Sequence, residues 1–264
     1  MIDLSDVTFM IPIQLESEDR IMNVNIITLY LRTHFNKNII IAEQGYESLI
    51  PNILSKTLYN TYIHYKTQNF YFHKAKLINA MVKKSNTKFV AMHDSDILCH
   101  PNQYEAAVNM LRSNSVDFVY PFDGHVINVP KASVAQVLDS LQYNFVRQQV
   151  TNLKALAHGG CVMYNREKFI NAGMMNENFI AYGPEDGEQD YRLRKLGYRH
   201  ARTGGALYHL EHARTENSRD EHKYAKSNFA EFTKVRKMNV EGLKRYINTW
   251  EWINEKNINN NTNI

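Results

Sequence analysis

The sequence predicts an α/β fold in which helices flank a mixed, mostly parallel sheet. The chain opens with an apolar strand, an amphipathic helix and a second apolar strand, the unit from which parallel sheets are built. Strand-like and helix-like segments then alternate as far as residue 122. Acidic residues directly follow one of the apolar strands, at the edge where open α/β sheets bind ligands. We expect one domain with a C-terminal helical extension.

The first three strands and the first helix follow from apolar patterns. Residues 7–13 and 38–42 are short apolar runs, typical of strands buried on both faces. Apolar side chains recur at helical spacing over residues 18–35, which predicts a helix between these strands. Residues 59–65 alternate in polarity and predict a third strand. This order is typical of one half of an open α/β sheet.

The next segments lead to an acidic triplet. Helical spacing over residues 73–84 precedes a predicted strand over residues 89–93, which runs directly into Asp94-Ser95-Asp96. Proline at the start of residues 101–111 is typical of a first helical turn, and residues 117–122 predict another strand. The triplet therefore lies at the carboxyl end of a strand.

The second half of the chain has a different texture. Residues 133–150 are predicted to be largely helical, whereas residues 158–190 place glycines, acids and aromatics close together. A helix over residues 186–196 should end at the following glycine, and residues 206–209 predict a short strand. Residues 220–252 are charged and helical in pattern. They could pack on the domain, pair with a second copy or rest on a membrane, and packing on the domain is the prediction.

Composition excludes several classes of protein. Of 264 residues, 44% are hydrophobic and 22% charged, which is ordinary for a globular chain. The formal net charge of +4 suits an anionic ligand, such as a nucleotide diphosphate, or weak attraction to an acidic membrane surface. No stripe of basic and aromatic residues indicates nucleic-acid binding.

The two cysteines fit a reducing compartment better than a disulfide scaffold. Residues 1–6 lack the features of a signal peptide, and no apolar run is long enough to cross a membrane. We therefore expect a cytoplasmic enzyme without a transmembrane segment, at the inner face of the membrane if it contacts lipid.

The acidic triplet is a candidate metal site. Two carboxylates two residues apart, Asp94 and Asp96, can place oxygens on one Mg²⁺ or Mn²⁺ ion, with Ser95 between them. Such an ion neutralises charge on a departing diphosphate. The alternative is a solvated turn that caps the next element. The position after a buried strand favours the metal site.

Glu185 and Asp186 follow Gly183-Pro184 at the start of a predicted helix. Acids at such a position often only cap the free backbone N–H groups. The neighbouring segment is polar and aromatic, however, and includes Tyr182. A carboxylate in such a place can take the proton from an attacking hydroxyl, so Asp186 is the candidate general base.

Two further groups could contribute to a site. His209 and His212 follow a predicted strand and can reach one metal ion together, although chance clustering is an alternative in a chain with 11 histidines. Phe72, Lys74 and Lys76 surround the start of a predicted helix that could meet a phosphate, the alternative being an amphipathic helix with a basic face.

The order of these motifs resembles a known family. FHKAKLINA precedes a strand and Asp-Ser-Asp, and HGGCVMYNREKFINAGMMNENFIAYGPEDGEQDYRLRKLG precedes a histidine-containing strand. Residues 7–214 thereby resemble the β-1,4-galactosyltransferase group and the related bacterial chondroitin-polymerase and family 2 transferases. The resemblance implies a GT-A fold, a UDP-sugar donor, a Mn²⁺ or Mg²⁺ cofactor and inversion at the anomeric carbon.

The resemblance also implies residue roles on the metal side. Asp96 and His212 match the family's metal ligands, and His209 falls where a second, softer ligand stands. Which histidine is the main ligand stays open. Asp94 matches the acid near the donor's ribose and sugar, and Phe72 and Lys74 match residues beside the uracil and the diphosphate.

On the sugar side, Tyr182 matches an aromatic wall, and Gly159 and Gly160 match a pair that lets the backbone approach the donor sugar. Glu185 and Asp186 match an acidic pair whose second member is the base.

The sequence departs from the family in two places. Pro184 stands where the family commonly has glycine, and Gly187 and Glu188 replace further acids. The loop around Pro12 lacks the family's usual arginine, and we place Arg20 in the donor site in its stead.

We expect residues 1–218 to form the GT-A domain. Its nucleotide-binding half should span residues 1–122, and its acceptor and catalytic half residues 123–218. A helical segment over residues 219–254 and a disordered tail over residues 255–264 should follow.

We therefore expect a metal-dependent inverting transfer of a hexose or N-acetylhexosamine from a UDP-sugar to a hydroxyl of a glycan or glycolipid acceptor. The sugar stays open among galactose, N-acetylgalactosamine, N-acetylglucosamine and glucuronic acid. Two alternatives are a nucleotidyltransferase, which would usually carry a glycine-rich phosphate loop near its first strand, and a non-catalytic sugar-binding module of the same fold.

Overall fold

The computed structural model describes residues 1–135, 156–219 and 221–253. A seven-stranded sheet with the order β3-β2-β1-β4-β8-β6-β9 forms the centre, and a three-stranded sheet, β5-β10-β7, lies beside it. The larger sheet is built from β1 (Ile2–Ile13), β2 (Phe35–Gly45), β3 (Thr61–Lys66), β4 (Phe89–His93), β6 (Phe118–Tyr120), β8 (Cys161–Asn165) and β9 (His200–Arg202). The smaller sheet is built from β5 (Ile97–Leu98), β7 (Val126–Val129) and β10 (Leu207–Leu210).

The predicted mixed, mostly parallel sheet is confirmed. Strand β1 pairs in parallel with β2 and β4, β2 pairs in parallel with β3, and β6 pairs in parallel with β9. Among the described strands of this sheet, only β8 is antiparallel to its neighbours, β4 and β6. The carboxyl ends of β1, β2 and β4 therefore meet at one edge, which is where the acidic triplet follows β4.

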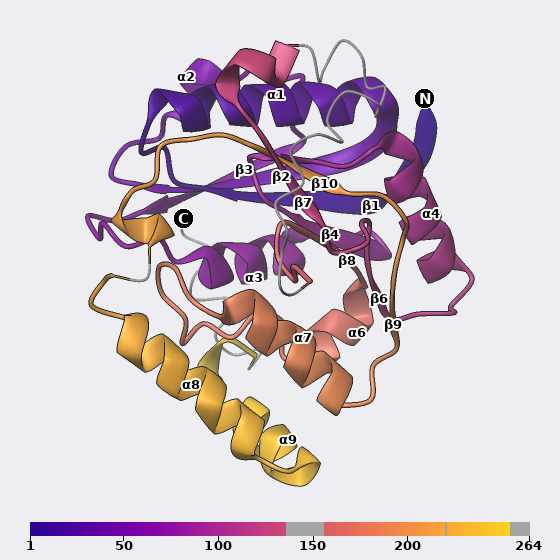
Figure 1. The fold of residues 1–264 in the computed structure, drawn as a ribbon, viewed down its shortest axis with the longest axis vertical. Helices are drawn as coiled ribbons and strands as arrows, with labels where there is room; N and C mark the ends of the chain where they lie inside the picture. The colour runs from indigo at the N-terminus through magenta and orange to yellow at the C-terminus, as the bar shows by residue number, and fades with distance from the viewer. Residues whose placement is uncertain (136–155, 220, 254–264) are drawn as a thin grey trace.

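Helices cover both faces of the larger sheet, as predicted (Figure 1). Helix α1 lies on the face opposite α3, and α7 lies on the α3 side. The helices are α1 (Glu18–His34), α2 (Ile50–Ile53), α3 (Lys74–Lys84), α4 (Pro101–Arg112), α6 (Arg166–Asn171), α7 (Glu185–Lys195), α8 (Ala225–Lys237) and α9 (Val240–Asn248). Short 3-10 turns are η1 (Lys131–Ser133), η3 (Glu216–Ser218) and η4 (Glu251–Ile253).

Several elements differ from the sequence prediction. Strand β1 begins at Ile2 rather than at residue 7, and β2 begins at Phe35, because α1 passes into the strand without a loop. The strands β5, β7, β8 and β9 and the helices α2 and α6 were not predicted, since most are two to six residues long. Most of the helix predicted over residues 133–150, and the tail at residues 255–264, lie outside the described residues.

The C-terminal helices pack on the domain, as predicted. Helix α8 contacts α7. A second apolar cluster lies beneath α9 and is formed by Val235, Leu243, Ile247 and Trp250. No helix in the described parts of the chain has both the length and the apolar character that crossing a bilayer requires.

A buried arginine of α7, which forms an ion pair within this helix, connects α7 to α6 and to the C-terminal helices. The Arg192 guanidinium is fully buried and donates to Glu188 Oε1 at 2.8 Å. It also donates to the carbonyls of Ala172 and Met174 and lies 5.1 Å from the centre of the Trp250 ring. Arg192 therefore holds α6, α7 and the C-terminal helices together, and it neutralises a carboxylate that has no access to water.

Replacing Arg192 by alanine should lower the free energy of unfolding by about 3–5 kcal/mol, because it leaves the Glu188 carboxylate buried without a charged partner. Urea unfolding followed by circular dichroism measures the change. The matched control is Arg194→Ala on the same helix, where the side chain is 53% exposed, and it should cost less than about 1 kcal/mol. Equal losses in the two variants would contradict this reading.

Candidate functional site

A cleft with a volume of about 310 Å³ opens at the carboxyl edge of the larger sheet. All but one of the predicted site residues line it: Pro12, Arg20, Phe72, Lys74, Asp94, Ser95, Asp96, Gly159, Gly160, Tyr182, Glu185, Asp186, His209 and His212. Segments that are distant in the sequence therefore converge on one space.

Three ligand-bearing side chains meet on one side of the cleft. The nearest donor atoms of Asp96, His209 and His212 all lie within 4.8 Å of one another. The pairing of β10 with β5 explains this, because it places His209 opposite Ile97, the residue next to Asp96. The Leu210 N–H also donates to the Asp96 carbonyl at 2.7 Å. Backbone hydrogen bonds thus fix the spacing of the three groups.

These side chains fit a divalent cation. A metal requires a deprotonated carboxylate and neutral imidazoles. Burial opposes ionisation of Asp96, but the hydrogen bond from His212 and the nearby charge of Arg20 lower its pKa. Burial lowers the pKa of His209, which keeps that ring neutral. One carboxylate and two imidazoles are a suitable donor set for Mn²⁺.

Arg20 contacts the same carboxylate. Its Nη1 donates to Asp96 Oδ2 at 3.1 Å, and His212 Nε2 lies 3.1 Å from that oxygen. The hydrogen bond to Asp96 raises the pKa of His212. Arg20 extends from the first turn of α1, whose N-cap is Ser17. Arg20, which follows the loop around Pro12, therefore does reach the cleft.

Lys74 joins the two acidic groups of the cleft. Its Nζ lies 2.9 Å from Asp94 Oδ1 and 3.7 Å from Asp186 Oδ1, and it is the first residue of α3. Burial opposes the charge on Lys74, but Asp186, Asp94 and Glu185 together raise its pKa, so the ammonium stays charged. One buried cation thus balances carboxylates from two distant segments.

Glu185 and Asp186 begin α7 without capping it. The N-cap is Pro184, and no side chain makes the capping hydrogen bond. Glu185 Oε2 and Asp186 Oδ1 are buried and make no hydrogen bond within the described residues. Burial raises the pKa of both carboxyls, and the neighbouring Asp186 charge helps to raise that of Glu185 to about 8. The capping alternative is therefore wrong for this pair.

Glycine is required beside the Asp186 carboxylate. A Cβ at Gly159 would lie 2.1 Å from Asp186 Oδ2, and a Cβ at Gly160 would lie 2.7 Å from Leu207 Cδ1. Gly160 also has a φ of +88°, in the region that favours glycine. The Gly160 carbonyl accepts from the Asp94 N–H at 2.8 Å. The pair therefore brings backbone close to both acidic groups.

A segment that sequence reasoning missed closes the cleft. Arg214, Asn217 and Ser218 line it, and the Phe72 N–H donates to Asn217 Oδ1 at 2.8 Å. We call residues 211–218 the strap. Proximity to His212 in the sequence is the signal that could have indicated these residues, because a segment that carries a metal ligand must pass over the site.

Lys76 is the predicted site residue that the structure does not bring to the cleft. Its Nζ donates to the Tyr65 hydroxyl at 2.9 Å and lies 4.5 Å from the centre of that ring. Two residues further along α3 than Lys74 corresponds to a rotation of about 200°, so the two lysines point to different sides. The helix-face alternative is correct for Lys76.

Two models of known protein families match this chain. A family model described as glycosyl transferase family 2 matches residues 23–173, more than half of the chain. A model described as the N-terminal domain of galactosyltransferase matches residues 151–215, which include the glycine pair, the acidic pair and both histidines. The comparison with curated proteins finds no match.

Solved structures are similar at low identity. The catalytic domain of Drosophila beta-1,4-galactosyltransferase 7 with xylobiose aligns at 20% identity with a TM-score of 0.46, covering 76% of this chain and 65% of that one. A mutant of that enzyme with manganese, UDP-Gal and xylobiose aligns at 20% identity and 0.51, covering 84% and 76%. The mannosyltransferase PcManGT from Pyrobaculum calidifontis with GDP-Man and Mn²⁺ aligns at 12% identity and 0.56, covering 94% and 69%.

The chain spans 65% of the first of these catalytic domains. The two alignments with TM-scores above 0.5 support the GT-A fold, and they identify the protein's architecture alone.

The raised pKa of Glu185 predicts a pH-dependent stability. The folded chain holds this proton up to about pH 8, whereas an unfolded glutamate releases it near the ordinary value of 4.5. The free energy of unfolding should therefore fall as pH rises through this window. Glu185→Gln cannot ionise, so by pH 9 it should gain at least about 1 kcal/mol over the wild type compared with pH 5.

Urea unfolding at pH 5, 7 and 9 checks this. Glu167→Gln is the matched control, since Glu167 is an exposed acid in the first turn of α6, and it should follow the wild type at each pH. A Glu185→Gln variant whose stability tracks the wild type across this range would show that Glu185 is not buried in its neutral form.

Proposed function

This chain belongs to glycosyl transferase family 2, and we propose that it moves a hexose or N-acetylhexosamine from a UDP-sugar to a hydroxyl of a glycan acceptor with inversion at the anomeric carbon. The observation that carries the proposal is the convergence of Asp96, His209 and His212 with Lys74 and Asp186 in one cleft. The match of residues 151–215 to a galactosyltransferase domain supports the choice of a UDP-sugar.

Asp96, His209 and His212 are the residues that would hold Mn²⁺ or Mg²⁺. The bound ion supplies charge neutralisation to the diphosphate leaving group. Two structural neighbours were solved with manganese, which supports this choice of metal. Arg20 lies on the same carboxylate, so its guanidinium is within reach of phosphate oxygens at that place.

The remaining donor contacts follow from position in the cleft. Lys74 presents a charged ammonium between the acidic groups, where it can bind a diphosphate oxygen. Phe72 and Pro12 offer apolar surface to a base, and Ser95 and Asp94 offer polar atoms to a ribose or sugar. The backbone of Gly159 and Gly160 and the ring of Tyr182 line the sugar end.

Asp186 is the residue that would accept the proton of the attacking hydroxyl. Its Oδ1 is buried and makes no hydrogen bond within the described residues, and burial raises the pKa of the carboxyl, which increases its basicity. Lys74 lies 3.7 Å from that oxygen and favours the ionised form. As the acceptor oxygen attacks on the face opposite the diphosphate, Asp186 takes its proton, which gives inversion by a single displacement.

Family membership removes one alternative raised by the sequence, the nucleotidyltransferase. The other, a sugar-binding module without activity, predicts that Asp96 and Asp186 can be replaced without effect. Release of UDP from a panel of UDP-sugars in the presence of Mn²⁺, with water as the acceptor, tests the proposal directly. No release with any UDP-sugar and no metal-dependent UDP binding would overturn it.

Asp186→Asn should lower turnover about 10²–10⁴-fold, because it removes the general base while keeping the shape of the side chain. Affinity for UDP should stay within about threefold of the wild type, since Asp186 is assigned to the acceptor hydroxyl and Lys74 keeps its closer partner, Asp94, at 2.9 Å. The measurements are UDP release and isothermal titration with UDP and Mn²⁺. Normal turnover in this variant would rule out Asp186 as the base.

Asp96→Ala should abolish Mn²⁺-dependent binding of UDP, because it removes the one carboxylate of the three-residue group. Isothermal titration with and without Mn²⁺ measures this. The matched control is Asp6→Ala, an acid paired with Arg112 away from the cleft, which should leave UDP binding unchanged. Retention of metal-dependent binding in Asp96→Ala would place the ion elsewhere.

A further inference from the structure

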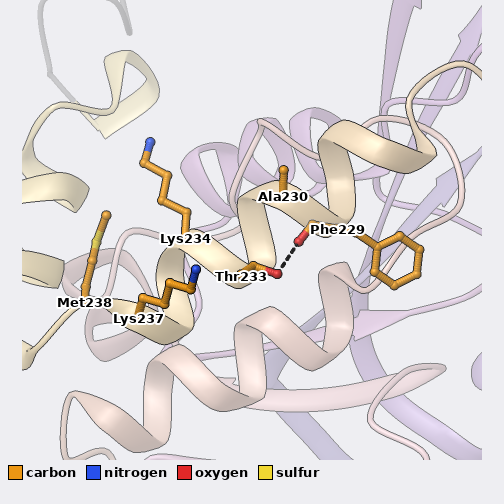
Figure 2. A pocket seen from close by; sticks show the side chains of 6 residues that line it. All are labelled: Phe229, Ala230, Thr233, Lys234, Lys237 and Met238. Atoms are coloured by element: carbon orange, nitrogen blue, oxygen red, sulfur yellow. Dashed lines mark hydrogen bonds between the residues drawn. The ribbon is translucent and has the colours of Figure 1, made fainter.

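The outer side of α8 forms a groove that the fold leaves open. Figure 2 shows its side chains, and the groove encloses about 660 Å³. Phe229 is 54% exposed at one end, although it is a large apolar residue. We call this surface the basic groove, and it consists of Phe229, Ala230, Thr233, Lys234, Lys237 and Met238.

The inner side of α8 already has its partners. Val235 is buried in the apolar cluster beneath α9, and Asn228 is fully buried. Glu231 accepts hydrogen bonds from Asn176 and Tyr246 at 2.8 and 2.6 Å. The contacts that attach α8 to the domain therefore use the side opposite the basic groove, whose residues are spaced three or four apart.

The charge of this region is one-sided. Residues 225–248 carry six basic and two acidic side chains, a net charge of +4 that equals the formal net charge of the whole chain. One of the two acids, Glu231, lies 3.9 Å from Lys234 of the groove, and the other, Glu241, lies 3.1 Å from Lys244, which leaves Lys226, Arg236, Lys237 and Arg245 without an acid of this segment beside them. The exposed basic residues are Lys226, Lys234, Arg236, Lys237, Lys244 and Arg245.

The first turn of α8 is attached to a loop that lines the cleft. The Asn228 side chain in the first turn of α8 donates to the Tyr182 carbonyl at 3.0 Å, and His222 Nε2 contacts the same carbonyl at 2.7 Å. A Cβ at Gly183 would lie 2.7 Å from Asn228 Nδ2. These contacts fix the first turn of α8 to the loop that lines the cleft, so the basic groove has a fixed place relative to the domain.

We propose that the basic groove and the basic residues around it dock the protein on an anionic lipid bilayer. An exposed phenylalanine among lysines matches the interface of such a bilayer, where the ring enters the acyl boundary and the ammonium groups meet the headgroups. Each lysine or arginine near an anionic leaflet strengthens binding about fivefold. A second copy of this surface would bring like charges together, which disfavours a symmetric dimer through it.

Co-sedimentation of the full chain with vesicles tests the proposal. The vesicles contain phosphatidylcholine alone, or phosphatidylcholine with about 30% phosphatidylglycerol. Binding should be found only with phosphatidylglycerol, and it should fall at least about tenfold when salt rises from about 0.05 to 0.5 M. Lys226→Glu/Lys237→Glu should lower the partition coefficient at least about tenfold, and Phe229→Ser should lower it severalfold at either salt concentration.

The matched control is Lys56→Glu/Lys84→Glu, which makes the same change in net charge. Lys84 is the exposed last residue of α3, as Lys237 is of α8, so the two double variants have comparable helix-end effects. The control should bind like the wild type, and thermal unfolding verifies that all variants fold.

Three results would overturn the proposal: no binding to anionic vesicles, equal losses in the two double variants, or a dimer in light scattering that Phe229→Ser disrupts without any vesicle binding. Vesicle binding needs neither metal nor donor, so its failure leaves the proposed transfer activity untouched.

Discussion

The pairing of β10 with β5 is the interaction on which the site depends. The two residues of β5 directly follow the acidic triplet. Strand β10, which lies more than a hundred residues further along the chain, pairs with them. Because this register sets His209 opposite Ile97, the candidate metal ligands are brought together by backbone hydrogen bonds rather than by flexible side chains. The strap directly follows β10 and covers the cleft. Strand β10 therefore positions His209 and leads into the segment that closes the cleft.

A second constraint is electrostatic. The cleft gathers Asp94, Asp96, Glu185 and Asp186 in partly or fully buried positions, and few cations balance them. Lys74 lies between Asp94 and Asp186, and Arg20 contacts Asp96 on the other side of the cleft. The cleft thus combines a pair of raised pKa values at the start of α7 with a lowered one at Asp96, which supports the proposed division into a proton-accepting end and a cation-binding end.

Much of this arrangement was predictable from local patterns. Apart from the short α2 and β5, the order of strands and helices as far as β6 follows from apolar runs and helical spacing, because most of these elements carry enough apolar residues to form a recognisable pattern. The short strands β5, β7 and β9 carry two to four residues each and have no pattern of their own, so only the fold reveals them. The motifs indicated fourteen residues that line the cleft, but helical geometry turns Lys76 away, and Asn217 enters through a contact with Phe72 that no spacing rule predicts.

The close approach of Gly159 to Asp186 limits which sequences can share this chemistry. A single added methyl group would collide with the carboxylate oxygen at 2.1 Å, while the strands and helices around it would need no other change. A related chain that keeps the aspartate but carries any larger residue at the position of Gly159 must displace one of the two. Under the proposed role of Asp186, the residue at position 159 therefore indicates, from sequence alone, whether a related chain can hold the aspartate in this place.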